Sequence, residues 1–144
     1  MIFKEVLRPP IWVLAFIYFL LLSLVIAIWA AFGGLTTSYA FIVATVAIIF
    51  IAFKARSTIS INNGELSIDK AHIEVKYLGQ VTVLDSPAMR LLRTRDADPA
   101  AFLAIKFWNP VGIKIEVNDP RDPTPYWLVT SKRGEEIAAL LINS

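Results

Sequence analysis

A long apolar run near the start of the chain is followed by alternating apolar and polar positions. Residues 9–53 contain no Asp, Glu, Lys, Arg or His. A membrane-spanning helix needs about 20 mainly apolar residues, and residues 11–32 and 35–53 each supply such a stretch. Fourteen residues of the first stretch are Leu, Ile, Phe or Val, which favours insertion by roughly 4 to 8 kcal/mol. The pattern predicts two transmembrane helices.

Neither a buried core hairpin nor a signal peptide fits this apolar run as well. In a soluble protein, the remaining residues would have to cover two helices that are apolar on every face, and so short a chain is too small to do so. Lys4 and Arg8 resemble the charged start of a signal peptide, but the apolar core of a signal peptide is only about 7 to 15 residues long. We therefore expect both helices to stay in the membrane.

The boundaries of the helices predict an antiparallel hairpin. Pro9 and Pro10 precede the first helix, and Gly33 and Gly34 follow it, as is typical of helix starts and ends. The hydroxyls of residues 36–38 are suited to cap the second helix. A connection this short makes the two helices antiparallel.

The basic residues that flank the helices predict the orientation of the hairpin. Lys4 and Arg8 precede the first helix, Lys54 and Arg56 follow the second, and the turn at 33–39 has no basic residue. Basic flanks stay in the cytoplasm. We therefore expect a multi-pass protein of the plasma membrane with both termini cytoplasmic.

Small residues recur at helical spacing and predict a helix-packing face on each span. They are Ser23, Ala27 and Ala31 in the first span and Ala40, Ala44 and Ala47 in the second. Small side chains let helix backbones approach closely, so we expect the two helices to pack on each other, with a homodimer or another membrane protein as the alternative partner. The spans hold no ionisable residue, which argues against a proton or ion path.

After residue 56 the pattern changes to strict alternation, which is strand spacing. Seven stretches are strand-like: 58–61, 65–68, 73–77, 81–83, 102–108, 111–117 and 126–130. Asn63-Gly64 is the preferred sequence of a tight hairpin turn, and Asn109-Pro110 predicts a second hairpin between 102–108 and 111–117. The sequence therefore predicts a small antiparallel β domain.

Two helices are expected within this domain. Ser86 is suited to cap an inserted helix that ends near Thr94, and Ser131 to cap a closing helix. The fold class is then an α+β membrane protein, with a transmembrane hairpin at 1–56 and a cytoplasmic β-rich domain at 57–144.

Charge and composition exclude several classes of function. Residues 54–144 carry twelve basic and eleven acidic side chains, so no basic surface indicates nucleic acid. The chain has no cysteine, which removes disulfides, thiolate nucleophiles and cysteine metal sites. We find no phosphate-binding glycine loop, nucleophile elbow or dinucleotide fingerprint. We therefore expect no cofactor and no enzyme activity.

His72 is the only histidine, and its position in the alternation places it on the outer face of a strand. Metal sites and acid or base catalysis usually need clustered histidines and carboxylates. We therefore expect no metal site and no catalytic residue. A hydrolase that uses Asp96, Asp98 or His72 is the enzymatic alternative.

The densest group of charges is Arg90, Arg93 and Arg95, followed by Asp96 and Asp98. A guanidinium group can donate two parallel hydrogen bonds to phosphate oxygens. The three arginines are therefore candidates for a contact with anionic lipid or phosphate. The alternative is a solvated helix end with local ion pairs, which the two aspartates favour.

Aromatic residues divide between the two predicted parts of the chain. Trp12, Trp29 and Tyr39 lie near the ends of the spans, where aromatic side chains are enriched at the membrane surface. Trp108 and Trp127 belong to the strand region, and we expect both to pack in its core.

Three segments carry a resemblance to a known family: 8–12 (RPPIW), 95–102 (RDADPAAF) and 122–129 (DPTPYWLV). Together they resemble a family of small actinobacterial membrane proteins that is defined only as a domain of unknown function. The resemblance implies a bacterial plasma membrane and no assigned catalytic residue. By element order alone, the chain is also similar to bacterial membrane-flanked pleckstrin-homology-like proteins.

These observations favour a membrane-anchored, non-catalytic recognition or scaffold module. The alternatives are an accessory subunit of a larger membrane complex and an unrecognised hydrolase. The expected partners are the lipid bilayer and either another membrane protein or a second copy of the chain, and nucleic acid is not expected.

Overall fold

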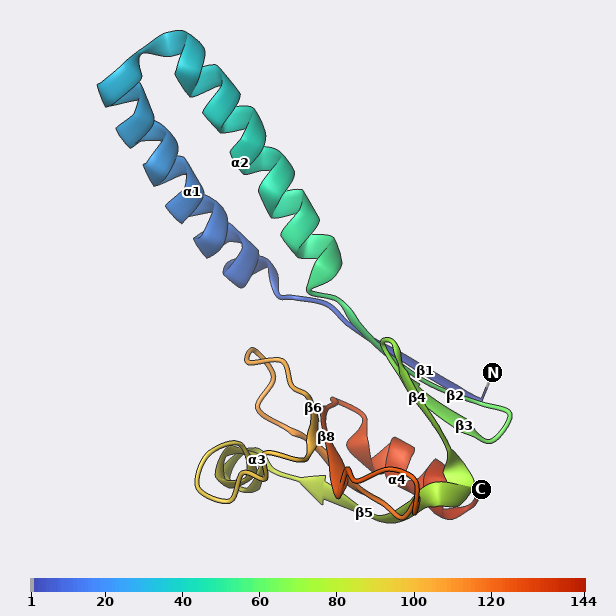
Figure 1. Ribbon diagram of the computed structural model, residues 1–144. Coiled ribbons are helices and arrows are strands. Elements are labelled where there is room, and N and C mark those ends of the chain that lie inside the picture. Colours follow the sequence, from blue (N-terminus) through green and yellow to red (C-terminus); the bar gives the residue numbers. More distant parts are fainter. Residues whose placement is uncertain (1) are drawn as a thin grey trace. The chain divides into compact units, whose positions relative to one another are not determined.

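The computed structural model describes residues 2–144 and consists of two compact units. Residues 8–56 form one unit, and the residues up to Leu7 together with Ser57–Ser144 form the other. The first unit holds two apolar helices, and the second holds two β-sheets and two further helices (Figure 1). The protein therefore has an α+β fold.

The first unit is a helical hairpin of α1 (Ile11–Phe32) and α2 (Gly34–Lys54), which confirms the two predicted helices. Both are long and apolar enough to span a membrane. Gly33 alone joins them, with a φ of 81° that favours glycine. Its N–H donates to the carbonyl of Trp29 and ends α1.

The prediction that hydroxyls of residues 36–38 cap α2 is wrong. Gly33 occupies the N-cap position, and no side chain caps the helix. Thr37 Oγ1 instead donates to the carbonyl of Gly33 at 2.7 Å, and Ser38 Oγ donates to that of Gly34 at 3.1 Å. Because the link is one residue long, α2 begins before residues 36–38, and these residues lie within its first turns.

The first sheet of the second unit is fully antiparallel, in the order β1-β2-β3-β4. Its strands are β1 (Phe3–Leu7), β2 (Ser57–Asn62), β3 (Glu65–Ile68) and β4 (Ala71–Glu74). Asn63 and Gly64, between β2 and β3, have φ values of 49° and 77°, which confirms the tight turn expected from these two residues.

Strand β1 belongs to the second unit, although the sequence pattern places it with the helical hairpin. The sequence pattern assigns residues 1–56 to the hairpin, but Leu7 pairs with Ser57 and Phe3 with Ile61. Figure 1 shows β1 (blue) along β2 (green). The helical hairpin is therefore an insertion between two adjacent antiparallel strands, and both of its ends connect to the same end of one sheet.

The second sheet has the order β5-β7-β8-β6. Its strands are β5 (Leu78–Leu84), β6 (Phe102–Ala104), β7 (Gly112–Val117) and β8 (Tyr126–Thr130), and a short 3-10 helix, η1 (Val75–Tyr77), precedes it. Residues 2–144 thus form eight strands, not seven.

The predicted hairpin of 102–108 with 111–117 is wrong. Strand β8 lies between β6 and β7, and β6 pairs with β8 in parallel. All five residues of β8 are buried. A strand that is apolar on both faces is covered best in the interior of a sheet, and this explains why β8 is not at an edge. The sheet is therefore mixed and not purely antiparallel.

The two helices of this unit are α3 (Ser86–Arg93) and α4 (Gly134–Ile142), and their caps differ from the predicted ones. Asp85, not Ser86, caps α3: its carboxylate accepts from the N–H of Ala88 at 3.0 Å. Helix α4 starts three residues after Ser131, because Ser131 binds Glu5 of β1 instead.

Two apolar clusters stabilise the second unit. The larger lies between one face of each sheet and α4, and the smaller lies between α3 and the other face of the second sheet. The fully buried residues of the larger cluster include Ile59, Leu66, Ile113, Ile115 and Ile137. The smaller cluster contains Leu84, Met89, Tyr126 and Leu128.

Candidate binding site

An open groove of about 830 Å³ lies at one end of the second sheet. Its walls come from the end of β5, a residue of α3, the start of β7, the segment that follows β8 and the first turn of α4. We call it the β5 groove, and it is lined by Thr82, Val83, Leu84, Asp85, Ala88, Val111, Gly112, Ser131, Lys132, Arg133, Gly134, Glu135 and Glu136. One wall is mainly apolar and the other is charged.

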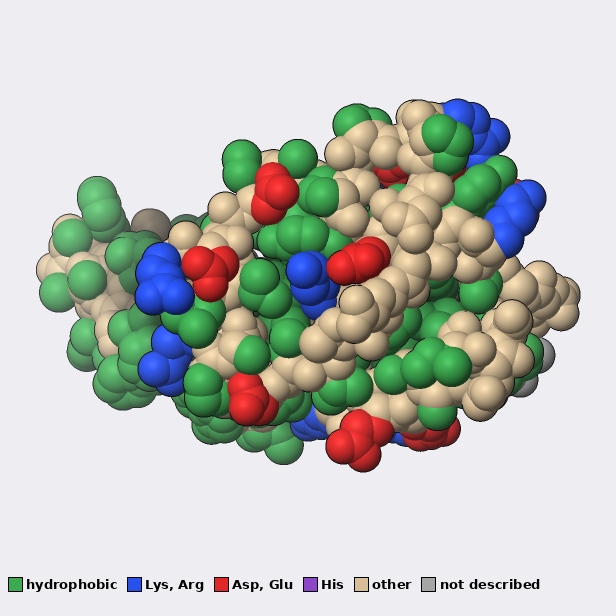
Figure 2. Space-filling view, turned by 90° about the horizontal axis from the view of Figure 1, so that it is seen from below, with side chains coloured by type: hydrophobic (Ala, Val, Ile, Leu, Met, Phe, Trp, Pro, Cys, Tyr) green, Lys and Arg blue, Asp and Glu red, His purple; other side chains and the backbone are tan. Residues whose placement is uncertain are grey.

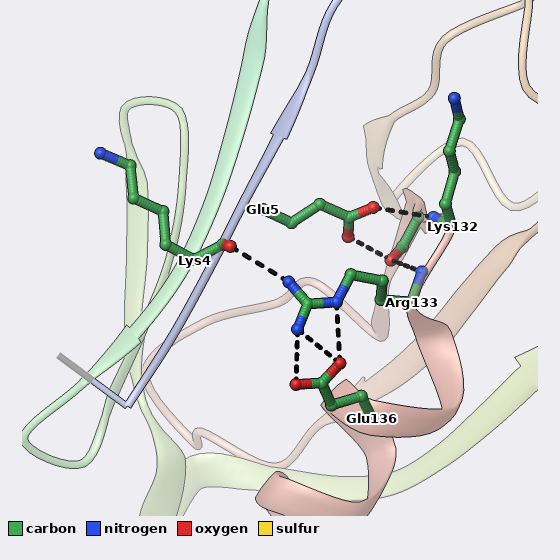
Figure 3. Close-up of polar contacts among 6 residues, drawn as sticks. Lys4, Glu5, Lys132, Arg133 and Glu136 are labelled. Carbon is green, nitrogen blue, oxygen red and sulfur yellow. Dashed lines mark hydrogen bonds and ion pairs between the residues drawn. The ribbon is translucent and has the colours of Figure 1, made fainter.

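A buried carboxylate holds the charged wall in place (Figure 3). Glu5 points inward from β1 and is 7% exposed. Its two oxygens accept from Ser131 Oγ at 2.5 Å and from the N–H of Lys132 at 2.9 Å. Hydrogen bonds to a charged acceptor are about twice as strong as neutral ones. Glu5 therefore fixes the segment between β8 and α4 against β1.

Arg133, in the same wall, is already paired within the protein. Its guanidinium donates to both carboxylate oxygens of Glu136 at 2.6–2.7 Å, and it lies 4.6 Å from the ring centroid of Phe3. The side chain of Lys132 extends away from Glu5 (Figure 3) and forms no ion pair with residues 2–144. Lys132 is thus a free cation at the groove.

The groove lies at the end of the sheet, beside a strand that has one unpaired edge. Strand β5 is at the end of its sheet, and within residues 2–144 it pairs with β7 alone. Four consecutive residues, 82–85, line the groove, and Thr82 and Val83 are exposed. An exposed sheet edge can accept an extended peptide as an added strand, with backbone hydrogen bonds for affinity and adjacent side chains for specificity.

A smaller cavity of about 400 Å³ lies elsewhere in this unit. Its lining includes His72, Tyr77, Asp119, Arg121 and Asp122. Arg121 donates to both oxygens of Asp119, at 3.2 and 3.3 Å, and its guanidinium lies 5.0 Å from the ring centroid of Tyr77. These contacts hold the turn at Asp119 and Arg121 against η1.

The pKa of Asp119 lies below its ordinary value of 3.8, chiefly because the Arg121 side chain donates to it. A carboxylate with a lowered folded-state pKa stabilises the fold above its ordinary pKa and loses that contribution as the pH falls through the lowered one. We expect an NMR titration to show a midpoint for Asp119 below 3.8, and Arg121→Gln to raise it. An unchanged midpoint in Arg121→Gln would contradict this assignment.

The residues of the hydrolase alternative lie in different parts of the unit. His72 is exposed on β4, whereas Asp96 pairs with Arg95 and Asp98 accepts from the N–H of Ala100 in the segment after α3. Within residues 2–144, no group of three His, Cys, Asp or Glu side chains could hold a metal ion.

The three arginines selected from the sequence lie at the end of α3 and just beyond it. Arg90 and Arg93 are in its last turn, where cations offset the helix dipole. Arg95 pairs with Asp96 at 3.4 Å. Figure 2 shows basic and acidic side chains interspersed, with no patch of one sign on the face in view. A contact of these arginines with anionic lipid or phosphate stays a prediction.

The small residues of the two helices have different surroundings. In α2, Ala44 is buried and Ala40 and Ala47 are half-buried, so this face packs on α1. In α1, all three of the selected residues, Ser23, Ala27 and Ala31, are exposed. The hairpin itself therefore uses the small face of α2 and leaves that of α1 uncovered.

The two tryptophans expected in the core are not alike. Trp127 is buried in β8, with its ring centroid 4.8 Å from that of Phe102. Trp108 is half-buried and lies in the loop between β6 and β7, stacked edge-on against the exposed Phe107. The core prediction is therefore wrong for Trp108, because β6 ends at Ala104.

Reasoning from the sequence missed Glu5 and the groove that it supports. The strand could have been recognised from the alternating positions of Phe3, Glu5 and Leu7, which all face inward. A carboxylate at the middle position interrupts the apolar alternation, so the strand is not recognised. The partners of Glu5 lie more than 120 residues away.

The fold and the groove define the class of protein. It is an α+β protein in which two apolar helices of membrane-spanning length are inserted into a two-sheet domain. This domain has an open groove with one apolar and one charged wall. Residues 2–141 match the family described as "Protein of unknown function (DUF3093)". The chain belongs to this family. No curated protein and no solved structure matches the chain.

Proposed function

We propose that this protein is a membrane-anchored, non-catalytic recognition module whose β5 groove binds an extended segment of a partner protein. The observation that carries the proposal is the groove of about 830 Å³ at the end of the second sheet, beside β5, which has one unpaired edge. Recognition by strand addition uses a free strand edge for affinity and side-chain contacts for specificity, and β5 and the groove beside it offer both.

The construction of the charged wall supports this role. The Glu5 carboxylate orients the 131–133 segment, and the ion pair of Arg133 with Glu136 fixes the first turn of α4. Lys132 and Glu135 remain as exposed charges beside the apolar positions of β5. A rigid wall reduces the ordering cost of binding.

The membrane anchor and its orientation are part of the proposal. The two apolar helices are connected to paired strand ends at Leu7 and Ser57, which favours one side of the membrane for both termini. The basic flanks of the helices favour the cytoplasmic side of a bacterial plasma membrane. The element order favours a pleckstrin-homology-like domain, although the parallel pairing of β6 with β8 departs from it.

A photo-crosslinking experiment tests the groove. The chain has no cysteine, so Thr82→Cys introduces one attachment point for a crosslinker in the full-length protein in its native membrane. We expect one discrete crosslinked protein, and a several-fold lower yield when Lys132→Glu is added. Asn62→Cys, exposed at the far end of β2, is the matched control, and equal products at both positions would refute the proposal.

A second candidate function is an accessory subunit of a larger membrane complex. The observation that favours it is the exposed face of α1 with Ser23, Ala27 and Ala31. Small residues at four-residue spacing allow close approach of another transmembrane helix. This face is uncovered by α2, so the occupant would be a helix of another chain.

Bulky substitutions on this face test the second candidate. Ala27→Leu with Ala31→Leu is expected to dissociate the complex on native gels, because the larger side chains separate the helix backbones. Ile26→Leu, at an exposed position on another face, should leave the complex intact. An unchanged complex in the double variant would argue against a helix-mediated assembly.

A further inference from the structure

We propose that the loop between β6 and β7, residues 105–111, inserts Phe107 and Trp108 into the headgroup region of the membrane that carries the two helices. This inference rests on the membrane anchoring proposed above. It makes the loop an additional membrane contact that orients the domain relative to the bilayer surface.

The loop and the strand before it expose two large apolar side chains. Phe107 is 67% exposed, and Leu103 on the neighbouring β6 is 54% exposed. The rings of Phe107 and Trp108 stack at 5.1 Å, and Lys106 Nζ lies 5.9 Å from the ring centroid of Trp108. Aromatic side chains beside a basic residue are typical of the membrane interface, where rings lie at the headgroup level.

Hydrogen bonds fix the base of the loop. The N–H of Lys106 donates to Oγ1 of the fully buried Thr130 at 2.9 Å. The N–H of Asn109 donates to the carbonyl of Lys106 at 3.2 Å, and Asn109 is itself buried. The aromatic rings are therefore presented by an ordered turn.

The base of the loop is connected through hydrogen bonds to β1, the strand that precedes the hairpin. Thr130, which binds Lys106, is followed by Ser131, which binds Glu5. Glu5 is two residues before Leu7, the last residue of β1. A short series of contacts thus joins the base of the loop to the strand end that continues into the hairpin.

Both connections to the hairpin are short. Three residues separate β1 from α1, and two separate α2 from β2. At about 3.3–3.6 Å per residue, these connections reach roughly 10–15 Å. The strand ends at Leu7 and Ser57 are therefore tethered within this distance of the helix ends.

The basic residues of these two segments favour lipid as the occupant. Arg8, Lys54 and Arg56 flank the hairpin, and Lys106 precedes the aromatic pair. Lys54 and Arg56 lie over the rings of Phe50 and Phe53, at 5.6 and 4.7 Å. Basic and aromatic groups together match an anionic membrane surface.

A probe attached at the loop tests the insertion. The full chain with the single substitution Phe107→Cys is labelled with an environment-sensitive fluorophore and reconstituted into vesicles of phosphatidylcholine and phosphatidylglycerol. We expect a blue-shifted emission and several-fold stronger quenching by lipid that carries a nitroxide near its headgroup than for labelled Asn62→Cys. Equal quenching at the two positions would overturn the proposal.

Two further readouts separate this inference from the proposed function. Alkaline extraction of the vesicles tests the anchoring alone, and release of the protein would contradict both proposals. If the protein resists extraction while the label at position 107 reports water, only the loop insertion is refuted. Protection of the label in native membranes but not in pure lipid would identify a protein as the occupant and also refute the insertion.

Discussion

Replacing Gly112 by Ala is expected to destabilise the second unit by about 3 kcal/mol or more. A Cβ at this position would lie 2.2 Å from the carbonyl oxygen of Val129 and 2.9 Å from Cε of Met89. The Met89 side chain can move, but the Val129 carbonyl belongs to the central strand β8 and is fixed by the sheet. The added methyl group must therefore separate β7 from β8.

Thermal unfolding in detergent, followed by circular dichroism, measures this effect. For a unit of this size, we expect the Tm of Gly112→Ala to fall by more than about 10 °C. Gly34→Ala is the matched control, because no atom lies within 4 Å of its added Cβ and its φ is not positive. A Gly112→Ala protein with the Tm of the control would contradict the close approach of these strands.

Replacing Glu5 by Ala is expected to cost about 2–4 kcal/mol of stability, since a hydrogen bond to a charged group contributes about 1.5–3 kcal/mol. The substitution removes a buried acceptor that serves Ser131 Oγ and the N–H of Lys132. The loss should also release β1 from the segment before α4. Hydrogen exchange of the β1 and β2 amides should therefore accelerate more than that of β7 and β8.

Two comparisons make the Glu5 result specific. Glu5→Gln keeps one acceptor for Lys132 and can donate its amide to Ser131, so we expect about half of the loss. Glu135→Ala removes an exposed carboxylate of the same groove and should change the stability by less than about 0.5 kcal/mol. Equal effects of Glu5→Ala and Glu135→Ala would show that the buried network does not stabilise the fold.

The elements that the sequence predicts best are those that depend on local patterns. The helix at 11–32 has the expected bounds, because a charge-free apolar stretch of that length has few alternatives. The turn at Asn63-Gly64 is also as expected, since it depends only on two residues that tolerate positive φ. The helix caps were less predictable. Asp85 and Ser86 are both suited to cap α3, and Asp85 does so. In α2, Gly33 takes the N-cap position ahead of the hydroxyls of residues 36–38.

The candidate groove was beyond the reach of sequence patterns. Its residues come from four elements, and the carboxylate that orients it is on β1, before the hairpin. The arginines chosen from the sequence form a visible run of charges, whereas Glu5 is a single acidic residue in a short segment. A local pattern reports charge density and not a pairing between distant residues.

The sequence by itself determined that two apolar helices are followed by a strand-rich unit with a closing helix, because periodicity and segregation of charge are properties of neighbouring residues. Only the tertiary structure decided that β1 pairs with β2 across the inserted hairpin, that β8 lies between β6 and β7, and that the small face of α1 stays uncovered. These features depend on which distant segments bury one another's apolar faces, and strand order is set by that mutual burial.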